Sequence, residues 1–199
     1  DWSKWHWQDV TDSWNWEGHE GENLGVEVYC AHETVELFLN GKSLGKQNTS
    51  SENEWIARWE VPYVTGSLKA IAYQGDEAVE SDELLTAGDP EVIRMKADRE
   101  SIRADGQDLC YVEVELADQD GNRSVQAGDQ VDFDLEGPGE IVAVASSNPM
   151  STESYQAPHR RAYQGRCLVV VKSLKQPGEI RLSASSENLE AAAIHIQTQ

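Results

Sequence analysis

Apolar and polar residues alternate with a period of two over most of the chain, and helical periodicity of useful length is absent. A period of two predicts strands that bury one face and expose the other. Such segments recur at spacings of about 8 to 12 residues with Gly, Asn and Pro between them, which is typical of β-sandwiches. The segments are residues 25–30, 34–45, 55–63, 67–73, 77–88, 109–117, 130–137, 141–146, 167–174, 179–185 and 191–197.

Two features make this prediction specific. In residues 109–117 the alternation places Cys110, Val112, Val114 and Leu116 on one face of a strand, with Tyr111, Glu113 and Glu115 on the other. Within residues 34–45, the dipeptide Asn40-Gly41 separates two short apolar runs, which is the strongest short-range signal for a two-residue hairpin. The chain is therefore predicted to be all-β.

A domain boundary is predicted near Gly88-Asp89-Pro90, a turn after which the alternation restarts at Val92. All seven tryptophans precede this turn. We expect two consecutive immunoglobulin-like β-sandwich domains: residues 1–88, comprising a Trp-rich connector and a first sandwich, and residues 89–199, a second sandwich.

The net charge of the chain limits the classes of partner that it is expected to bind. The formal net charge is -20, with 36 acidic against 16 basic residues. Such an acidic protein is repelled by nucleic-acid backbones and anionic membranes, so neither is an expected partner. The longest apolar run, Cys167–Val171, is far too short for a membrane span.

The three cysteines, Cys30, Cys110 and Cys167, are too far apart for a zinc or redox motif. Cys110 and Cys167 each begin an apolar strand-like run, and their separation suits a disulfide between the two sheets of a sandwich. Two buried free thiols are nevertheless the favoured interpretation, and the disulfide is the alternative.

The sequence offers only weak support for any catalytic group. Paired carboxylates occur at Asp132 and Asp134 and at Glu113 and Glu115, but i and i+2 positions on a solvent face lack the burial that a glycosidase pair requires. Residues 118–124, DQDGNRS, resemble a tight hairpin more than a calcium loop. The one basic cluster, residues 159–161, is expected on a loop and paired with nearby carboxylates. We therefore expect no catalytic residue, no metal site and no cofactor.

Three stretches of the sequence resemble a known protein family. They are SWNWEGHEG (13–21), VEVYCAHETVELFLNGKSLGK (26–46) and RWEVPYVTGSLKAIAYQGDEAVESDELLTAG (58–88). They resemble the accessory β-domain that follows the barrel in many glycoside hydrolase family 2 enzymes, chiefly β-galactosidases. Residues 93–122, 133–149 and 163–173 are similar to the last β-domain of the same enzymes. One loop departs from that family: Ser146-Ser147-Asn148-Pro149 stands where a Gly-Asn-Gly-Asp-like turn is usual.

The resemblance implies a non-catalytic C-terminal region of a retaining family 2 glycoside hydrolase. Its two catalytic glutamates would lie on a (β/α)₈ barrel N-terminal to Asp1, so the chain alone is expected to be inactive and to buttress that barrel. The resemblance also implies a secreted or periplasmic site, and contacts of the parent enzyme with carbohydrate or with a second copy.

The tryptophans leave one further function open. Trp2, Trp5, Trp7, Trp14 and Trp16 crowd the first sixteen positions. Trp5 with Trp7, or Trp14 with Trp16, share a face in an extended chain and could stack on a sugar, as in a carbohydrate-binding module. The resemblance favours a different interpretation, an interface with the barrel through Trp2, Trp5 and Trp7, with Trp14 and Trp16 packing on the first sandwich; the sugar platform is the alternative. Trp55 and Trp59, at i and i+4, are expected to face the same core.

Overall fold

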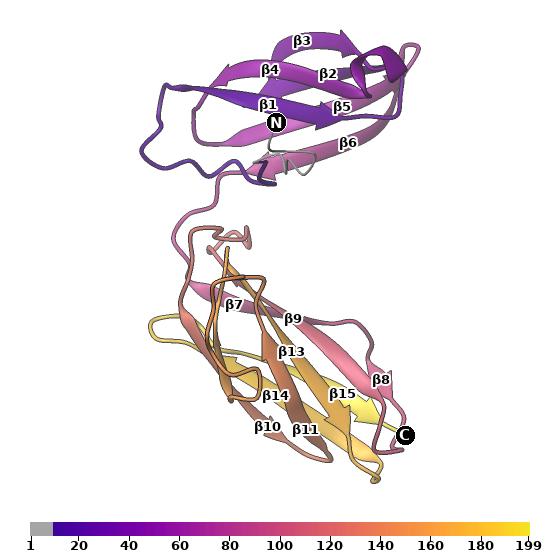
Figure 1. Cartoon of the computed structure of the whole chain (residues 1–199), viewed down its shortest axis with the longest axis vertical. Helices are drawn as coiled ribbons and strands as arrows, with labels where there is room; N and C mark the ends of the chain where they lie inside the picture. The colour runs from indigo at the N-terminus through magenta and orange to yellow at the C-terminus, as the bar shows by residue number, and fades with distance from the viewer. Residues whose placement is uncertain (1–9) are drawn as a thin grey trace, which may run out of the picture. The chain divides into compact units, whose positions relative to one another are not determined.

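A computed structural model of the chain describes residues 10–199, and these form two compact units, unit 1 (up to Thr86) and unit 2 (from Ala87 on). The division falls between Thr86 and Ala87, whereas the sequence places it after Gly88. Both units consist of antiparallel sheets, with one parallel pair in unit 2, as Figure 1 shows. The all-β prediction is confirmed.

Unit 1 is a small sandwich in which a two-stranded sheet packs against a four-stranded sheet. One sheet has the order β1-β4 and the other the order β3-β2-β5-β6. Side chains of both sheets meet in a core around Leu37, Val61, Tyr63 and Leu68, with a second cluster around Val35 and Ala57. Its elements are β1 (Asn23–Tyr29), β2 (Thr34–Leu39), β3 (Lys42–Asn48), the 3₁₀ turn η1 (Ser51–Asn53), β4 (Ile56–Pro62), β5 (Ser67–Gln74) and β6 (Glu77–Leu85).

The predicted hairpin joins β2 to β3 through a two-residue turn. Asn40 and Gly41 have φ of 49° and 77°, as a type I′ turn requires. The Asn40 side chain donates to the Thr65 carbonyl at 3.0 Å and accepts from the Ser67 N–H at 2.8 Å. Gly66 passes so close to this amide that a Cβ there would lie 1.9 Å from Asn40 Oδ1. The turn is thus tied to the start of β5.

Unit 2 is a larger sandwich with sheet orders β12-β10-β14-β15-β8 and β11-β13-β9-β7. The predicted inward residues of β9, from Cys110 to Leu116, are fully buried, and Val131 and Phe133 of β10 face them across the core. Its strands are β7 (Val92–Ala97), β8 (Ser101–Ile102), β9 (Leu109–Ala117), β10 (Gln130–Glu136), β11 (Gly139–Ala145), β12 (His159–Arg161), β13 (Arg166–Ser173), β14 (Gly178–Ser185) and β15 (Ala192–Thr198).

The segment 118–124 is the tight turn that the sequence predicts. The Asp118 N–H donates to the Asn122 carbonyl at 2.9 Å, and the Asp118 carboxylate accepts from the N–H groups of Asn122 (2.8 Å) and Gly88 (2.9 Å). This carboxylate therefore fastens the first residues of unit 2 to the turn. Burial of Asp118 opposes ionisation, but these hydrogen bonds outweigh it and lower the pKa of the carboxyl.

Candidate functional site

Trp14 is a core residue of unit 1. Only 2% of it is exposed, and its ring meets Tyr63 edge to face, with the centroids 5.2 Å apart. The indole N–H donates to the Val64 carbonyl at 2.9 Å, and Thr86 Oγ1 donates to the Trp14 carbonyl at 2.7 Å. Trp14 and Trp16 thus pack on the first sandwich, as one of the two sequence interpretations expects, and a ring enclosed like that of Trp14 cannot stack on a sugar. Trp2, Trp5 and Trp7 lie outside the described residues.

Trp16 is half-buried and lines a groove of about 560 Å³ on unit 1, which we call the β1 groove. One side is formed by residues 24–29 of β1, and the other by Leu68 and Ala70 of β5 and Leu84 of β6. Residues 10–14 line it as well. The groove is therefore bounded by inner-face side chains of both sheets and by the first described residues of the chain.

Trp55 differs from the sequence prediction. Strand β4 begins at Ile56, and Glu54 and Trp55 before it have φ of 59° and 62°. Trp55 is 46% exposed, while Trp59 packs against the core. The two tryptophans thus do not share one environment, because two successive left-handed residues precede the strand.

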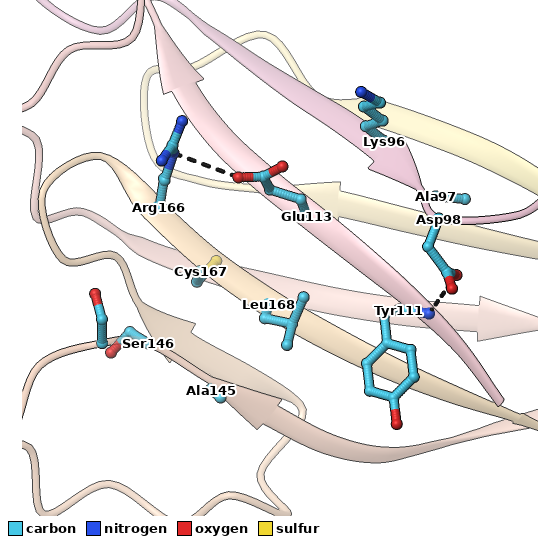
Figure 2. Close-up of a pocket in the computed structure, with 11 residues that line it drawn as sticks. Lys96, Ala97, Asp98, Tyr111, Glu113, Ala145, Ser146, Arg166, Cys167 and Leu168 are labelled. Carbon is cyan, nitrogen blue, oxygen red and sulfur yellow. Dashed lines mark hydrogen bonds and ion pairs between the residues drawn. The ribbon is translucent and has the colours of Figure 1, made fainter. Parts of the chain in front are cut away.

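Unit 2 has a hollow of about 490 Å³ on the outer face of the β11-β13-β9-β7 sheet, which we call the Tyr111 hollow (Figure 2). Cross-strand pairing places Ala145, Leu168, Glu113 and Lys96 in one row across this face. Tyr111 is 43% exposed. Ser146 and Ser147, from the loop after β11, also line the hollow. A partly exposed aromatic ring thus shares the hollow with apolar side chains and with polar side chains of β7, β9, β13 and the loop after β11.

The charges of the Tyr111 hollow are largely paired. Asp98 accepts from the Tyr111 N–H at 2.8 Å and from Arg99 Nε at 3.0 Å. Burial works against ionisation of Asp98, but hydrogen bonds from the Tyr111 N–H, the Cys110 thiol and Arg99 lower its pKa. Arg166 Nε lies 3.4 Å from Glu113 (Figure 2). The hollow thus presents fixed acceptors and donors rather than a free reactive group.

The paired carboxylates of the sequence do not form a catalytic pair. Arg166 bridges Glu113 and Glu115, with its Nη2 2.9 Å from Glu115. Asp132 and Asp134 are exposed on the outer face of β10. A general acid of a glycosidase requires a carboxyl held in surroundings that raise its pKa, across a cleft from its partner. Within residues 10–199, no group of three His, Cys, Asp or Glu is placed to hold a metal ion.

No disulfide joins Cys110 and Cys167, and all three cysteines are free and buried. Cys110 pairs with Val171 and Cys167 with Val114, so the two cysteines lie on neighbouring strands of one sheet, four positions apart in register. Four residues of a strand span roughly 13 Å, whereas the Cα atoms of a disulfide lie within about 7 Å. Buried free thiols, the favoured interpretation, fit this arrangement.

The buried thiols are expected to be unreactive in the folded protein. Burial raises the pKa of Cys110 to about 11 and that of Cys167 to about 12. Because the thiolate is the nucleophile, labelling with a thiol reagent at pH 8 should reach these two only after unfolding. In denaturant and without a reductant, a thiol assay should detect three free thiols per chain. Detection of a single free thiol per chain would show that a disulfide is present.

The basic cluster of residues 159–161 forms the short strand β12 instead of the expected loop. Arg160 is only 1% exposed. Its guanidinium donates to Ser146 Oγ and to the Glu153 carbonyl, each at 3.2 Å, and Nε lies 3.8 Å from the Glu153 carboxylate. The predicted local ion pair is therefore present. Arg160 holds the loop 146–158 to the body of unit 2, a role that no sequence signal indicated.

No helix among residues 10–199 has the length and apolar character needed to cross a bilayer.

Comparison with known proteins shows the family to which the chain belongs. Residues 93–195 match the family model described as glycoside hydrolase family 2 C-terminal domain 5. The chain belongs to glycoside hydrolase family 2. Residues 21–80 match a further model, a domain of unknown function (DUF4982).

The family 2 relatives are much longer than this chain. The β-galactosidase BoGH2A of Bacteroides ovatus is 38% identical over 94% of this chain, which spans 22% of that protein. A solved family 2 member from Bacteroides cellulosilyticus superposes over the whole chain with a TM-score of 0.95 at 44% identity. A β-glycosidase structure from Bacteroides vulgatus covers 94% of the chain with a TM-score of 0.90 at 27% identity. This chain spans 26% and 24% of those two chains.

Proposed function

We propose that the chain is a non-catalytic, C-terminal region of a larger β-galactosidase-like enzyme, and that it buttresses the catalytic barrel of the same polypeptide. The observation that carries this proposal is the asymmetry of coverage. Between 94% and 100% of this chain matches relatives of which it spans only 22% to 26%.

The site chemistry supports the same proposal. The acid/base and nucleophile of a retaining glycosidase are two carboxyl groups about 5 to 5.5 Å apart on either side of the scissile bond. In the described part of the chain, the paired carboxylates of β9 are bridged by Arg166 and those of β10 face solvent. These residues can stabilise a fold, but they do not provide that chemistry.

Hydrolysis assays test the non-catalytic role. The isolated chain, incubated with nitrophenyl β-D-galactoside or β-D-glucuronide, is expected to release no nitrophenol above the buffer rate. Turnover that is lost with Glu113→Gln or Asp132→Asn, and not with Glu179→Gln on β14, would contradict the proposal.

A second candidate function, carbohydrate binding, rests on the Tyr111 hollow. Its volume of about 490 Å³ lies within the range of small-molecule sites. Tyr111 offers a partly exposed ring for stacking on a sugar face, and Glu113, Lys96 and Ser146 offer hydrogen-bonding groups around it. This site differs from the tryptophan platform that the sequence suggests.

Calorimetric titration with galactose and galacto-oligosaccharides tests this second function. Because residues 87–199 contain no tryptophan, sugar bound at the Tyr111 hollow should release heat without changing the tryptophan emission. Tyr111→Ala should lower the affinity at least tenfold, whereas Tyr155→Ala, an exposed tyrosine elsewhere in unit 2, should not. No heat at millimolar sugar would rule the hollow out as a sugar site.

We also propose that the parent enzyme forms a homo-oligomer. Light scattering of the full-length parent tests this point, and a monomeric parent would contradict it.

A further inference from the structure

The charged side chains of the Tyr111 hollow differ in whether they have a partner. Glu113 lies 3.4 Å from Arg166, and Asp98 lies 3.0 Å from the guanidinium of the next residue. Lys96 stands directly opposite Glu113 in the pairing of β7 with β9, but Figure 2 shows Arg166 and not Lys96 joined to that carboxylate. Within the part of the chain that the structure describes, the ammonium group of Lys96 forms no ion pair and no hydrogen bond. The hollow therefore combines partnered carboxylates with an unpartnered cation.

The loop after β11 adds a second unused donor to the hollow. Arg160, which is almost fully buried, donates to Ser146 Oγ at 3.2 Å. A serine hydroxyl that accepts one hydrogen bond can still donate its own proton. Among residues 10–199 the hydroxyl of Ser146 has no acceptor for that proton. A buried arginine thus holds in place a hydroxyl that lines the hollow and is available as a donor.

The spacing of the strands lets a sugar reach from the aromatic ring to the lysine. Ala145, Leu168, Glu113 and Lys96 form one row on four neighbouring strands, which spans roughly 14 Å at about 4.8 Å per strand. Tyr111 is a diagonal neighbour of Lys96 across β9 and β7, at a distance of about 7 to 8 Å. A pyranose ring on the partly exposed face of Tyr111 can therefore place a substituent at Lys96.

We propose that the Tyr111 hollow binds an acidic sugar, a pyranose that carries a carboxylate or a sulfate ester, with its ring face on Tyr111 and its acidic group at Lys96. The unused groups of Lys96 and Ser146 are donors, so the ligand that complements them is rich in acceptors. An ionised acceptor forms the stronger hydrogen bond with an ammonium group. This assignment rests on the second function proposed above, carbohydrate binding, and adds the class of sugar.

The net charge of -20 is compatible with an acidic ligand at this place. At physiological ionic strength the Debye length is about 8 Å, so exposed carboxylates elsewhere on the molecule are largely screened. The carboxylates that line the hollow, Asp98 and Glu113, each have an arginine beside them. At short range, the charge in the hollow that has no partner among the described residues is that of Lys96.

Calorimetric titration of the full chain with three glycosides that differ only at C6 tests the proposal. They are methyl β-D-galacturonide, methyl β-D-galactoside 6-sulfate and methyl β-D-galactoside. At least one acidic glycoside should bind about tenfold more tightly than the neutral one, because it gains a charge-assisted hydrogen bond. Raising the salt concentration from about 0.1 M to about 0.5 M should weaken the binding of the acidic glycosides and leave that of the neutral one unchanged.

Two lysine variants locate the effect. Lys96→Gln should reduce the preference for the acidic glycoside to about twofold or less, since the remaining amide carries no charge. Lys175→Gln makes the same change in net charge at an exposed lysine of unit 2 that does not line the hollow, and it should keep the full preference. Both lysines are exposed, so the unfolding midpoints should match that of the parent chain.

The outcomes separate this proposal from the function on which it rests. Tighter binding of the galacturonide identifies a carboxylate as the ligand group, and tighter binding of the sulfate identifies the ester; either result supports the proposal. Equal affinities for all three glycosides, or a preference that survives Lys96→Gln, would overturn it while the hollow remains a sugar site. No heat with any of the three at millimolar concentration would overturn the proposed sugar binding, and the acidic-sugar assignment with it.

Discussion

Replacing Trp14 with alanine is expected to lower the free energy of unfolding of unit 1 by about 3–5 kcal/mol, the range for removing a large buried aromatic. The ring is almost fully enclosed, contacts Tyr63 edge to face and uses its N–H on the Val64 carbonyl. All tryptophans precede unit 2 in the sequence, so the changes in emission that accompany the unfolding of Trp14, Trp16, Trp55 and Trp59 follow unit 1 and not unit 2. The midpoint should fall with little change in the slope.

Two further variants separate the contributions to this loss. Trp14→Phe keeps an aromatic ring near Tyr63 but removes the donor to Val64, so its loss should be smaller, about 1–3 kcal/mol. Trp55→Ala, at a position 46% exposed, should cost about 1 kcal/mol or less. A loss for Trp55→Ala as large as that for Trp14→Ala would contradict the assignment of Trp14 to the core.

The second large effect is expected at Arg160. Arg160→Ala should destabilise unit 2 by about 3–5 kcal/mol, because it leaves a cavity and removes the donor to Ser146 Oγ and to the Glu153 carbonyl. Scanning calorimetry should show the unit 2 transition moving to lower temperature. The tryptophan emission, which reports on unit 1, should keep its own midpoint.

Arg181→Ala is the matched control for Arg160. Arg181 also lies on a strand of unit 2 and lies 3.7 Å from a carboxylate, Glu136, but its side chain is 45% exposed. Exposed ion pairs contribute about 0–1 kcal/mol, so this variant should melt close to the parent. Equal losses for the two arginines would show that burial of Arg160 is not the source of its effect.

The sequence predicts those parts of the fold that depend on local pattern. The alternation over β9 identifies its buried face because side chains of a strand alternate in direction whatever it pairs with. Asn40-Gly41 identifies a hairpin because both residues tolerate a positive φ. The family resemblance, carried by strings in both units, is confirmed by the match over residues 93–195.

The sequence leaves undecided those pairs of residues whose contact depends on tertiary structure. Cys110 and Cys167 both begin apolar strands, but the sequence does not tell that β9 and β13 are neighbours in one sheet. The sequence alone does not decide whether Trp14 and Trp16 share an exposed face; the segment lies outside the strands, buries Trp14 and leaves Trp16 half-buried. The burial of Arg160 depends on a loop of which Glu153 and Ser146 are parts. A sequence window around residue 160 shows only an apparently exposed basic cluster.

Deletion of residues 1–199 from the full-length parent enzyme tests the buttressing role most directly. The rate of thermal inactivation would be followed by nitrophenyl galactoside hydrolysis, with the intact parent as the reference. We expect the shortened enzyme to lose activity at a temperature at least several degrees lower, and the separately expressed chain, added back, to restore part of the difference. A shortened enzyme that matches the intact one in both activity and inactivation temperature would contradict the proposed role.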